Sequence, residues 1–120
     1  MEKSTLKIGR RGEEIARNYL EEKGYKTVEQ NFRNRFAEID LVMKDKKELV
    51  FVEVRAKTNE RFGTPEESLN KKKLKKVKKN ALAYTAMAHW RGPFRVDAVC
   101  LVLTENGEVK RLSHHQNILV

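Results

Sequence analysis

Apolar and charged positions alternate most clearly in two short runs in the first half of the chain. Residues 37–42 (Ala-Glu-Ile-Asp-Leu-Val) and residues 51–55 (Phe-Val-Glu-Val-Arg) both repeat with a period of two, which is typical of β-strands with one buried face. The polar segment 45–48 (Asp-Lys-Lys-Glu) lies between them and suits a short hairpin turn. The pattern therefore predicts an antiparallel hairpin.

The position of the turn decides which side chains of this hairpin share a face. With the turn centred in residues 46–47, Asp40 lies opposite Glu53, and the same register puts Glu38 opposite Arg55. The other face of the hairpin is then entirely apolar: Ile39, Leu41, Met43, Val50, Val52 and Val54. A slip of one residue would move half of the charges onto that apolar face, so this register is the expected one.

Two predicted helices flank the hairpin. Apolar residues recur at helical spacing over residues 9–23, and Gly24 is a suitable C-cap for that helix. A second helix is predicted to begin near Thr64, where Thr-Pro-Glu-Glu forms a capping-box pattern, and to end near His89. Asn70 offers a second helix start, which leaves open whether a short turn precedes a longer helix.

Three further strands complete the predicted order. They cover residues 25–32, 94–103 and 108–112. The chain thus runs through one helix, three strands, one helix and two strands, which indicates an α/β fold with a mixed β-sheet flanked by helices. A length of 120 residues suits a single domain that spans residues 1–120.

The charge of the chain favours a polyanionic partner. Lys and Arg total 26 against 17 Asp and Glu, a formal net charge of +9, which points to nucleic acid ahead of a membrane surface. Residues 71–79 include seven lysines. Arg10 and Arg11 are further candidates for phosphate contact, together with the lysines of that segment: Lys71, Lys72, Lys73, Lys75, Lys76 and Lys79. A solvated basic helix face is the alternative interpretation.

Several classes of site and location are disfavoured by the sequence. Cys100 is the only cysteine and lies in an apolar run, so we expect a buried structural thiol and a reducing compartment. His89, His114 and His115 show no zinc-ligand spacing with Cys100, which argues against zinc. No apolar stretch could span a bilayer and the charged N-terminus does not resemble a signal peptide, so a cytoplasmic protein is expected.

Asp40 and Glu53 are the first candidates for chemistry. Two like charges ~4 Å apart repel by ~4 kcal/mol at an effective dielectric constant of ~20, and a divalent cation such as Mg²⁺, which prefers oxygen ligands, would remove that repulsion. The alternative is an exposed hairpin face on which Glu38 pairs with Arg55 while Asp40 points into water.

Two other acids have competing interpretations. Glu13 lies along the edge of the apolar stripe of the first helix, where it either supplies a third carboxylate to the hairpin acids or pairs with Arg17. Composition alone favours the pair with Arg17. Asp97 lies in an otherwise apolar strand, and we expect it to pair with Arg95 or another base rather than to bind a metal.

A series of short motifs adds a family resemblance. They are Gly-Arg-Arg-Gly-Glu (9–13), Gly-Tyr (24–25), Asn-Phe-Arg (31–33), Glu-Ile-Asp-Leu-Val (38–42), Phe-Val-Glu-Val-Arg (51–55), Phe-Gly-Thr-Pro (62–65) and Arg-Val-Asp (95–97). Each motif is weak alone, but their order and spacing are specific and cover nearly the whole chain. With them the sequence resembles the YraN-like family of uncharacterised predicted endonucleases, which is related to archaeal Holliday junction resolvases in the PD-(D/E)XK nuclease superfamily.

This resemblance implies a restriction-endonuclease-like core with a metal site on the hairpin. Asp40 and Glu53 would take the metal-binding positions of the superfamily, and Glu13 would take the helical Glu of the resolvases. Arg55 stands where the superfamily has its catalytic Lys, and Arg is a poor proton acceptor. Lys57, two residues further along the same strand face, is the alternative cation.

Three functions are consistent with these residues. The first is a Mg²⁺- or Mn²⁺-dependent endonuclease that hydrolyses phosphodiester bonds in DNA, with branched, Holliday-junction-like DNA as one candidate substrate; related resolvases act as homodimers. The second is a non-catalytic nucleic-acid-binding module on a nuclease-like fold, with residues 71–79 as its main contact. A protein-interaction subunit of a DNA-processing complex is the third and weakest interpretation.

Overall fold

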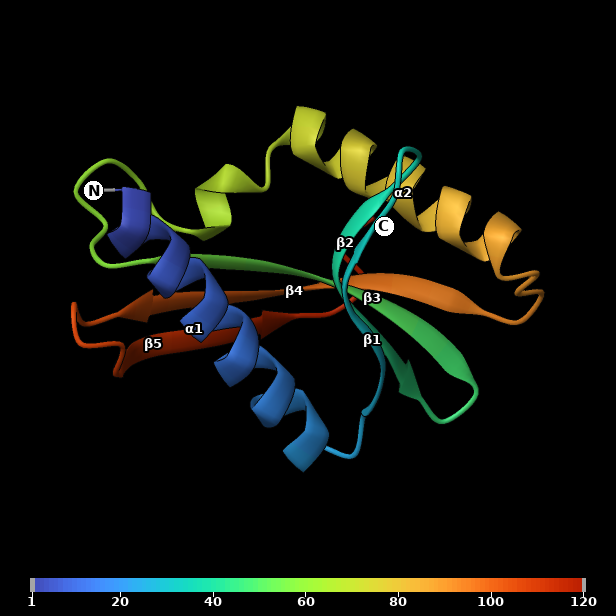
Figure 1. Ribbon diagram of the computed structural model, residues 1–120, viewed down its shortest axis with the longest axis horizontal. Helices are drawn as coiled ribbons and strands as arrows, with labels where there is room; N and C mark the ends of the chain where they lie inside the picture. Colours follow the sequence, from blue (N-terminus) through green and yellow to red (C-terminus); the bar gives the residue numbers. More distant parts are fainter. Residues whose placement is uncertain (1, 120) are drawn as a thin grey trace.

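One five-stranded mixed sheet organises the protein. The computed structural model describes residues 2–119, and within them the strands follow the order β1-β2-β3-β4-β5 across the sheet (Figure 1). The elements in chain order are α1 (Glu2–Glu22), β1 (Lys26–Arg33), β2 (Glu38–Asp45), β3 (Glu48–Lys57), the 3₁₀-helix η1 (Glu66–Ser68), α2 (Lys71–Met87), β4 (Phe94–Leu103) and β5 (Val109–His115). Strands β3 and β4 are parallel, and the other neighbours are antiparallel. The predicted order and the mixed sheet are confirmed.

The two helices cover opposite faces of this sheet. Ala16 and Leu20 of α1 are fully buried against one face, where they pack on alternate residues of the central strands such as Leu41. Val77 of α2 packs on the other face in a cluster that includes Phe51. Full burial of each of the larger side chains stabilises the fold by about 1.5–3 kcal/mol. Because alternate residues of β2 and β3 point to opposite faces, their apolar side chains give each helix a surface on which to pack. Among residues 2–119, neither helix is long and apolar enough to cross a membrane.

The predicted hairpin register is confirmed. Asp45 pairs with Glu48 across the two-residue turn, and the ladder continues to the pair of Leu41 with Val52. One further step along this register brings Asp40 opposite residue 53. The predicted apolar face is confirmed except at Ile39.

Ile39 was predicted on the wrong face. It packs with Val42 and Phe51 in the α2 cluster, whereas Leu41 packs in the α1 cluster. The ladder between β2 and β3 stops at Leu41, so the pleat of β3 no longer constrains the strand at position 39. Strict alternation therefore fails two residues beyond the last cross-strand pair.

The start of the second helix follows the alternative that the sequence left open. Thr64 and Glu67 form the reciprocal capping box, with backbone amides bonded at 3.1 and 3.2 Å, but the segment makes only the short η1 turn. Asn70 caps α2 by accepting a hydrogen bond from the backbone N–H of Lys73 at 2.9 Å. Of the two possibilities left open by the sequence, the structure therefore shows a short turn followed by a longer helix that begins at a second cap.

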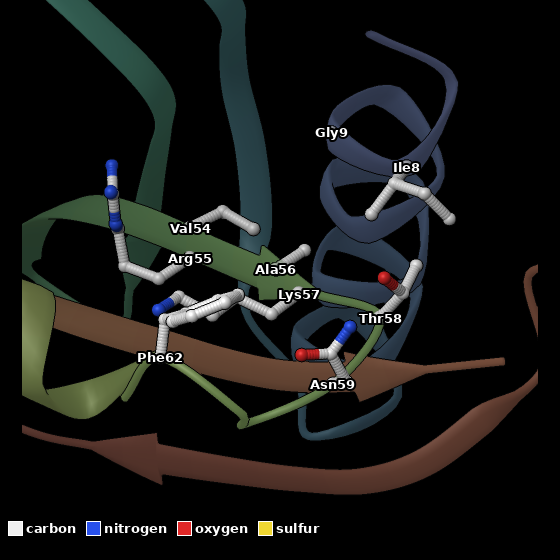
Figure 2. A pocket seen from close by; sticks show the side chains of 9 residues that line it. All are labelled: Ile8, Gly9, Val54, Arg55, Ala56, Lys57, Thr58, Asn59 and Phe62. Atoms are coloured by element: carbon white, nitrogen blue, oxygen red, sulfur yellow. The ribbon is translucent and has the colours of Figure 1, made fainter. Parts of the chain in front are cut away.

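The end of β3 is uncovered on one side. The carboxylate of Asp40 accepts the backbone N–H of Val54 at 2.9 Å, and it does so where the ladder with β2 ends. Strand β3 then continues beside β4 as far as Lys57. A hollow of about 450 Å³ opens along this part of β3, between it and the start of α1 (Figure 2).

Candidate metal and nucleic-acid site

Three carboxylates from three elements line two neighbouring hollows where β2 leaves β3, although their oxygen atoms do not all lie within 4.8 Å of one another. Asp40 borders two hollows at this point. One is a crevice of about 10 Å³ under α2 that is also lined by Glu53 and Val77. The other is an open hollow of about 450 Å³ that is also lined by Glu13 and Arg10 of α1. Asp40 therefore lies between the other two acids.

The charges of these acids perturb one another. Burial, followed by the negative charge of Asp40 and a hydrogen bond to it, raises the pKa of Glu53 to about 8. Burial and the charge of Asp40 raise the pKa of Glu13 to about 7, although Arg10 lowers it. Both carboxyls thus retain protons near neutral pH when no cation is bound. Such raised pKa values in neighbouring acids are typical of functional sites.

Asn31 of β1 orients Glu13. With its amide nitrogen directed toward α1, Asn31 donates to both carboxylate oxygens of Glu13, at 3.0 and 2.8 Å. Its backbone has a φ of 50°, which is uncommon for a residue in a strand. Arg17, the alternative partner of Glu13, donates instead to Gln30 at 2.9 Å. The interpretation of Glu13 as half of a pair with Arg17 is therefore wrong.

A lysine from α2 reaches the acid cluster. The Nζ of Lys73 lies 3.7 Å from Oε1 of Glu53, and the two side chains are only 28% and 14% exposed. Arg55 is also close enough for its charge to lower the pKa of Glu53, but its Nε donates to Ser68 at 2.8 Å. Lys57 donates to the carbonyl of residue 63 at 3.1 Å. Lys73 is thus the cation that contacts a carboxylate of the site directly.

The exposed-hairpin interpretation is also wrong. Arg55 is held by Ser68, and Glu38 lies 3.9 Å from Arg33. Asp40 bonds to the backbone of β3 instead of pointing into water. Asp40 and Glu53 are therefore held next to each other by contacts within the protein.

The match to known proteins covers this cluster. Residues 12–101 match the model of a family described as "Uncharacterised protein family UPF0102". The chain belongs to the UPF0102 family. A UPF0102 protein of Thermodesulfovibrio yellowstonii is 38% identical over 112 residues, which are 93% of this chain and 95% of the relative. Another, from Pelotomaculum thermopropionicum, is 40% identical over 111 residues, which are 92% of each chain. The YraN-like resemblance is thus confirmed, and the names of these UPF0102 relatives state no reaction.

The lysine segment of this UPF0102 chain divides into two parts. Val77 is buried against the sheet, and Lys73 contacts Glu53. The remaining candidate lysines of α2 are exposed: Lys71, Lys72, Lys75, Lys76 and Lys79. Arg10 and Arg11 are exposed on α1; Arg10 borders the acid hollow, whereas Arg11 pairs with Glu14 at 2.7 Å.

Asp97 belongs to a separate ion cluster, as predicted. It is fully buried and accepts hydrogen bonds from Arg95 and His114, both at 2.9 Å, and from the backbone N–H of Asn117 at 3.0 Å. Burial alone would raise the pKa of Asp97, but the bonds from His114 and Arg95 outweigh burial and lower it. This carboxylate is fully satisfied by protein groups.

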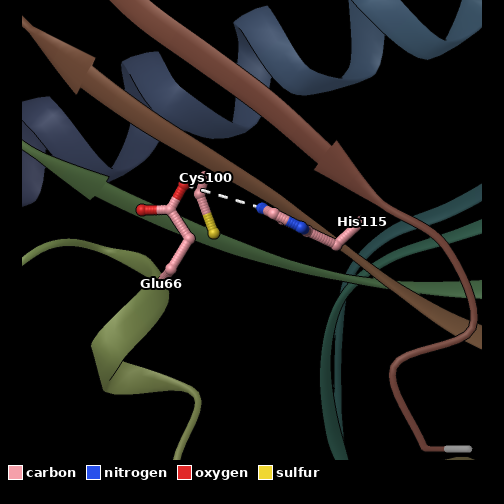
Figure 3. A group of neighbouring side chains, drawn as sticks. All are labelled: Glu66, Cys100 and His115. Carbon is pink, nitrogen blue, oxygen red and sulfur yellow. Dashed lines mark ion pairs between the residues drawn. The ribbon is translucent and has the colours of Figure 1, made fainter.

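Cys100 lies in a second group that residue spacing did not reveal. Ligand atoms of Glu66, Cys100 and His115 lie within 4.8 Å of one another, contributed by η1, β4 and β5 (Figure 3). Spacing alone was therefore an insufficient reason to exclude a Cys–His site. Glu66 is held at both carboxylate oxygens by Arg111, at 2.6 and 2.9 Å, and also accepts from Ser113. Burial raises the pKa of Cys100 to about 12, so the thiol is protonated and buried, as expected.

Proposed function

We propose that this protein is a Mg²⁺- or Mn²⁺-dependent nuclease that hydrolyses phosphodiester bonds in DNA, on a restriction-endonuclease-like core. One observation carries the proposal: Asp40 lies beside both Glu13 and Glu53, and Lys73 is the one cation in direct contact with these acids among the described residues. The pKa values of Glu13 and Glu53 are raised to about 7 and 8. A half-buried cluster of mutually repelling acids is destabilising unless a ligand compensates it.

The donor set fits a hard divalent cation. All candidate ligand atoms are carboxylate oxygens, which Mg²⁺ and Mn²⁺ prefer. Asp40 and Glu53 would hold the ion, with Glu13 as a third ligand or as a group that positions water. When bound, the ion would lower the pKa of a coordinated water and polarise the scissile phosphate.

Protein cations would complete the reaction site. Lys73 holds its ammonium group beside Glu53, where it would stabilise negative charge that develops on the phosphate. Arg55 follows Glu53 on β3 and would bind a phosphate oxygen. Lys57, further along the same strand, would bind the next phosphate. Asn31 fixes the orientation of Glu13 through both carboxylate oxygens.

The basic surface would bind the DNA backbone. The exposed lysines of α2 and the net charge of +9 favour contacts to phosphates that do not depend on sequence. Branched DNA is the preferred candidate substrate, and a homodimer would allow cleavage of two strands. A cytoplasmic location would give access to DNA.

Cleavage assays with Asp40→Asn test the proposal. Wild-type protein is expected to cut branched or single-stranded DNA with Mg²⁺ or Mn²⁺, and EDTA is expected to stop the reaction. Asp40→Asn is expected to lose at least 100-fold in rate with DNA binding retained. Glu14→Gln is the matched control, because Glu14 lies beside Glu13 but pairs with Arg11 on the solvent side. Equal rates in wild type and Asp40→Asn would end this mechanism.

A non-catalytic DNA-binding module is the second candidate. Its specific support is Arg55, which replaces the usual catalytic Lys of the superfamily and is engaged by Ser68. This function predicts metal-independent binding that weakens with salt and with Lys→Gln changes on α2. Metal-dependent cleavage that Asp40→Asn removes would exclude it.

A further inference from the structure

The hollow at the end of β3 has the composition of a nucleotide site. Its volume is about 450 Å³ and its lining comprises Ile8 and Gly9 of α1, residues 54–59 and Phe62. Ile8, Val54 and Ala56 lie on the α1 side of β3, whereas Arg55 and Lys57 leave its other face, where Lys57 lies beside Phe62 (Figure 2). An aromatic ring beside two cations matches a base linked to a phosphate.

Phe62 is the most unusual side chain of this hollow. It is 92% exposed, the highest value among the exposed large apolar side chains in the described part of the chain. The loop nevertheless holds it in place: the N–H of Gly63 donates to the carbonyl of Glu60 at 3.2 Å, and Lys57 donates to the carbonyl of Gly63 at 3.1 Å. The aromatic ring is thus displayed on a hydrogen-bonded turn beside Lys57 (Figure 2).

The hollow adjoins the acid cluster. Gly9 lines both this hollow and the one that holds Glu13 and Asp40. Val54, another lining residue, donates its backbone N–H to Asp40. A strand with one phosphate at the acids would therefore extend toward this hollow.

We propose that the hollow binds one unpaired nucleotide of the substrate strand, with its base stacked on Phe62 and its phosphate beside Arg55 and Lys57. This inference rests on the proposed function and narrows its substrate. A base stacked inside a duplex has no free face for an aromatic side chain, whereas unpaired bases stack on one readily. The substrate therefore includes a single-stranded segment, as at a branch or a flap.

The test measures binding without cleavage, in the Asp40→Asn background and without divalent metal. Single-stranded oligonucleotides that carry one 2-aminopurine report stacking by loss of fluorescence, and anisotropy reports affinity; a continuous duplex is the reference. Phe62→Ala is expected to abolish the fluorescence change and to weaken single-strand binding about tenfold, with duplex affinity unchanged. Phe62→Trp should retain stacking. Leu82→Ala is the matched control, since Leu82 is exposed on α2.

A second variant blocks the hollow without disturbing the fold. A Cβ atom at Gly9 would meet nothing within 4 Å, and replacement of a helical Gly by Leu favours the helix. Gly9→Leu is therefore expected to fold at least as stably as the parent protein and to weaken single-strand binding and reduce stacking as Phe62→Ala does.

The outcomes separate this inference from the proposed function. Unchanged single-strand affinity and fluorescence in both Phe62→Ala and Gly9→Leu would overturn the inference even if the wild type cuts DNA. Loss of stacking in both variants, with no metal-dependent cleavage by the wild type, would support the nucleotide-binding site and contradict the proposed nuclease activity.

Discussion

Two carboxylate clusters in this protein differ in charge balance. Asp97 of β4 is fully buried and has a lowered pKa because His114 and Arg95 donate to it. The side chain of Glu53 is 14% exposed, yet its pKa rises to about 8 because of burial and because its close neighbour is the acid Asp40. Burial opposes ionisation in both clusters, so the partners decide the direction of each pKa shift.

The comparison distinguishes a structural cluster from the one that we propose binds a metal ion. The bonds to Asp97 are supplied entirely by the chain, so ionisation there stabilises the fold. At the other cluster, Lys73 lies 3.7 Å from Glu53 and is the single direct cation contact to the three acids in the described residues. The remaining negative charge is available for a divalent cation, and it costs stability when none is bound.

The largest expected effect is on the structural cluster. Asp97→Ala removes one of the three acids that pair with the largely buried Arg95 and leaves His114 and the backbone N–H of Asn117 without their acceptor. It should lower the free energy of unfolding by about 3–5 kcal/mol. Because the pKa of Asp97 is lowered, its stabilisation is present above about pH 4 and is lost as the pH falls further. Urea unfolding at pH 5 and pH 8 should therefore show the loss at both. Glu105→Ala, at an exposed acid, is the control, and equal stability of the two variants would contradict the comparison.

A smaller effect is expected from Lys73→Gln. Loss of a preorganised positive group at the phosphate should reduce cleavage about 100-fold, while DNA binding falls no more than in Lys72→Gln, which changes an exposed lysine one residue away. The loss of Lys73 should also raise the pKa of Glu53 further, since Lys73 now lowers it, and shift the pH–rate profile to higher pH. Equal losses of cleavage rate and DNA affinity in Lys73→Gln and Lys72→Gln would show that Lys73 only contacts the DNA backbone and has no role in cleavage.

The smallest effect is a gain in stability from Asp40→Asn. The pKa values of Glu13 and Glu53 are raised above their usual value of 4.5 to about 7 and 8, so wild-type stability falls as the pH rises through that range. Without metal, Asp40→Asn should be more stable than wild type by about 1 kcal/mol at pH 8, after allowance for solvent screening. The gain should vanish at pH 5, and urea unfolding at the two pH values checks this. A loss of stability at pH 8 would contradict the proposed repulsion.

Local patterns predicted the part of the site that lies within the hairpin. The position of the turn and the period of two were sufficient to bring Asp40 opposite Glu53, because both are properties of adjacent residues. The prediction failed at Ile39, where the cross-strand pairs end. The family-level resemblance added Glu13, which composition alone would have assigned to a surface ion pair.

The remaining parts of the site depend on contacts between distant elements. Lys73 was predicted only as one basic residue among many, and its position at Glu53 follows from the docking of α2 on the sheet. Asn31, an unusual residue in a strand, was quoted in a motif without a role. Cys100 and His115 come together because β4 pairs with β5, which residue spacing does not encode.

Calorimetric titration of Mn²⁺ into wild-type protein and Asp40→Asn tests the central claim most directly. At pH 7.5, in two buffers with different ionisation enthalpies, the wild type should bind Mn²⁺ and release protons, because Glu13 and Glu53 must lose theirs to bind the ion. Asp40→Asn should show no Mn²⁺ binding. Glu14→Gln, at an exposed acid, should bind Mn²⁺ as the wild type does. Equal Mn²⁺ binding by wild type and Asp40→Asn, or binding without proton release, would contradict the account.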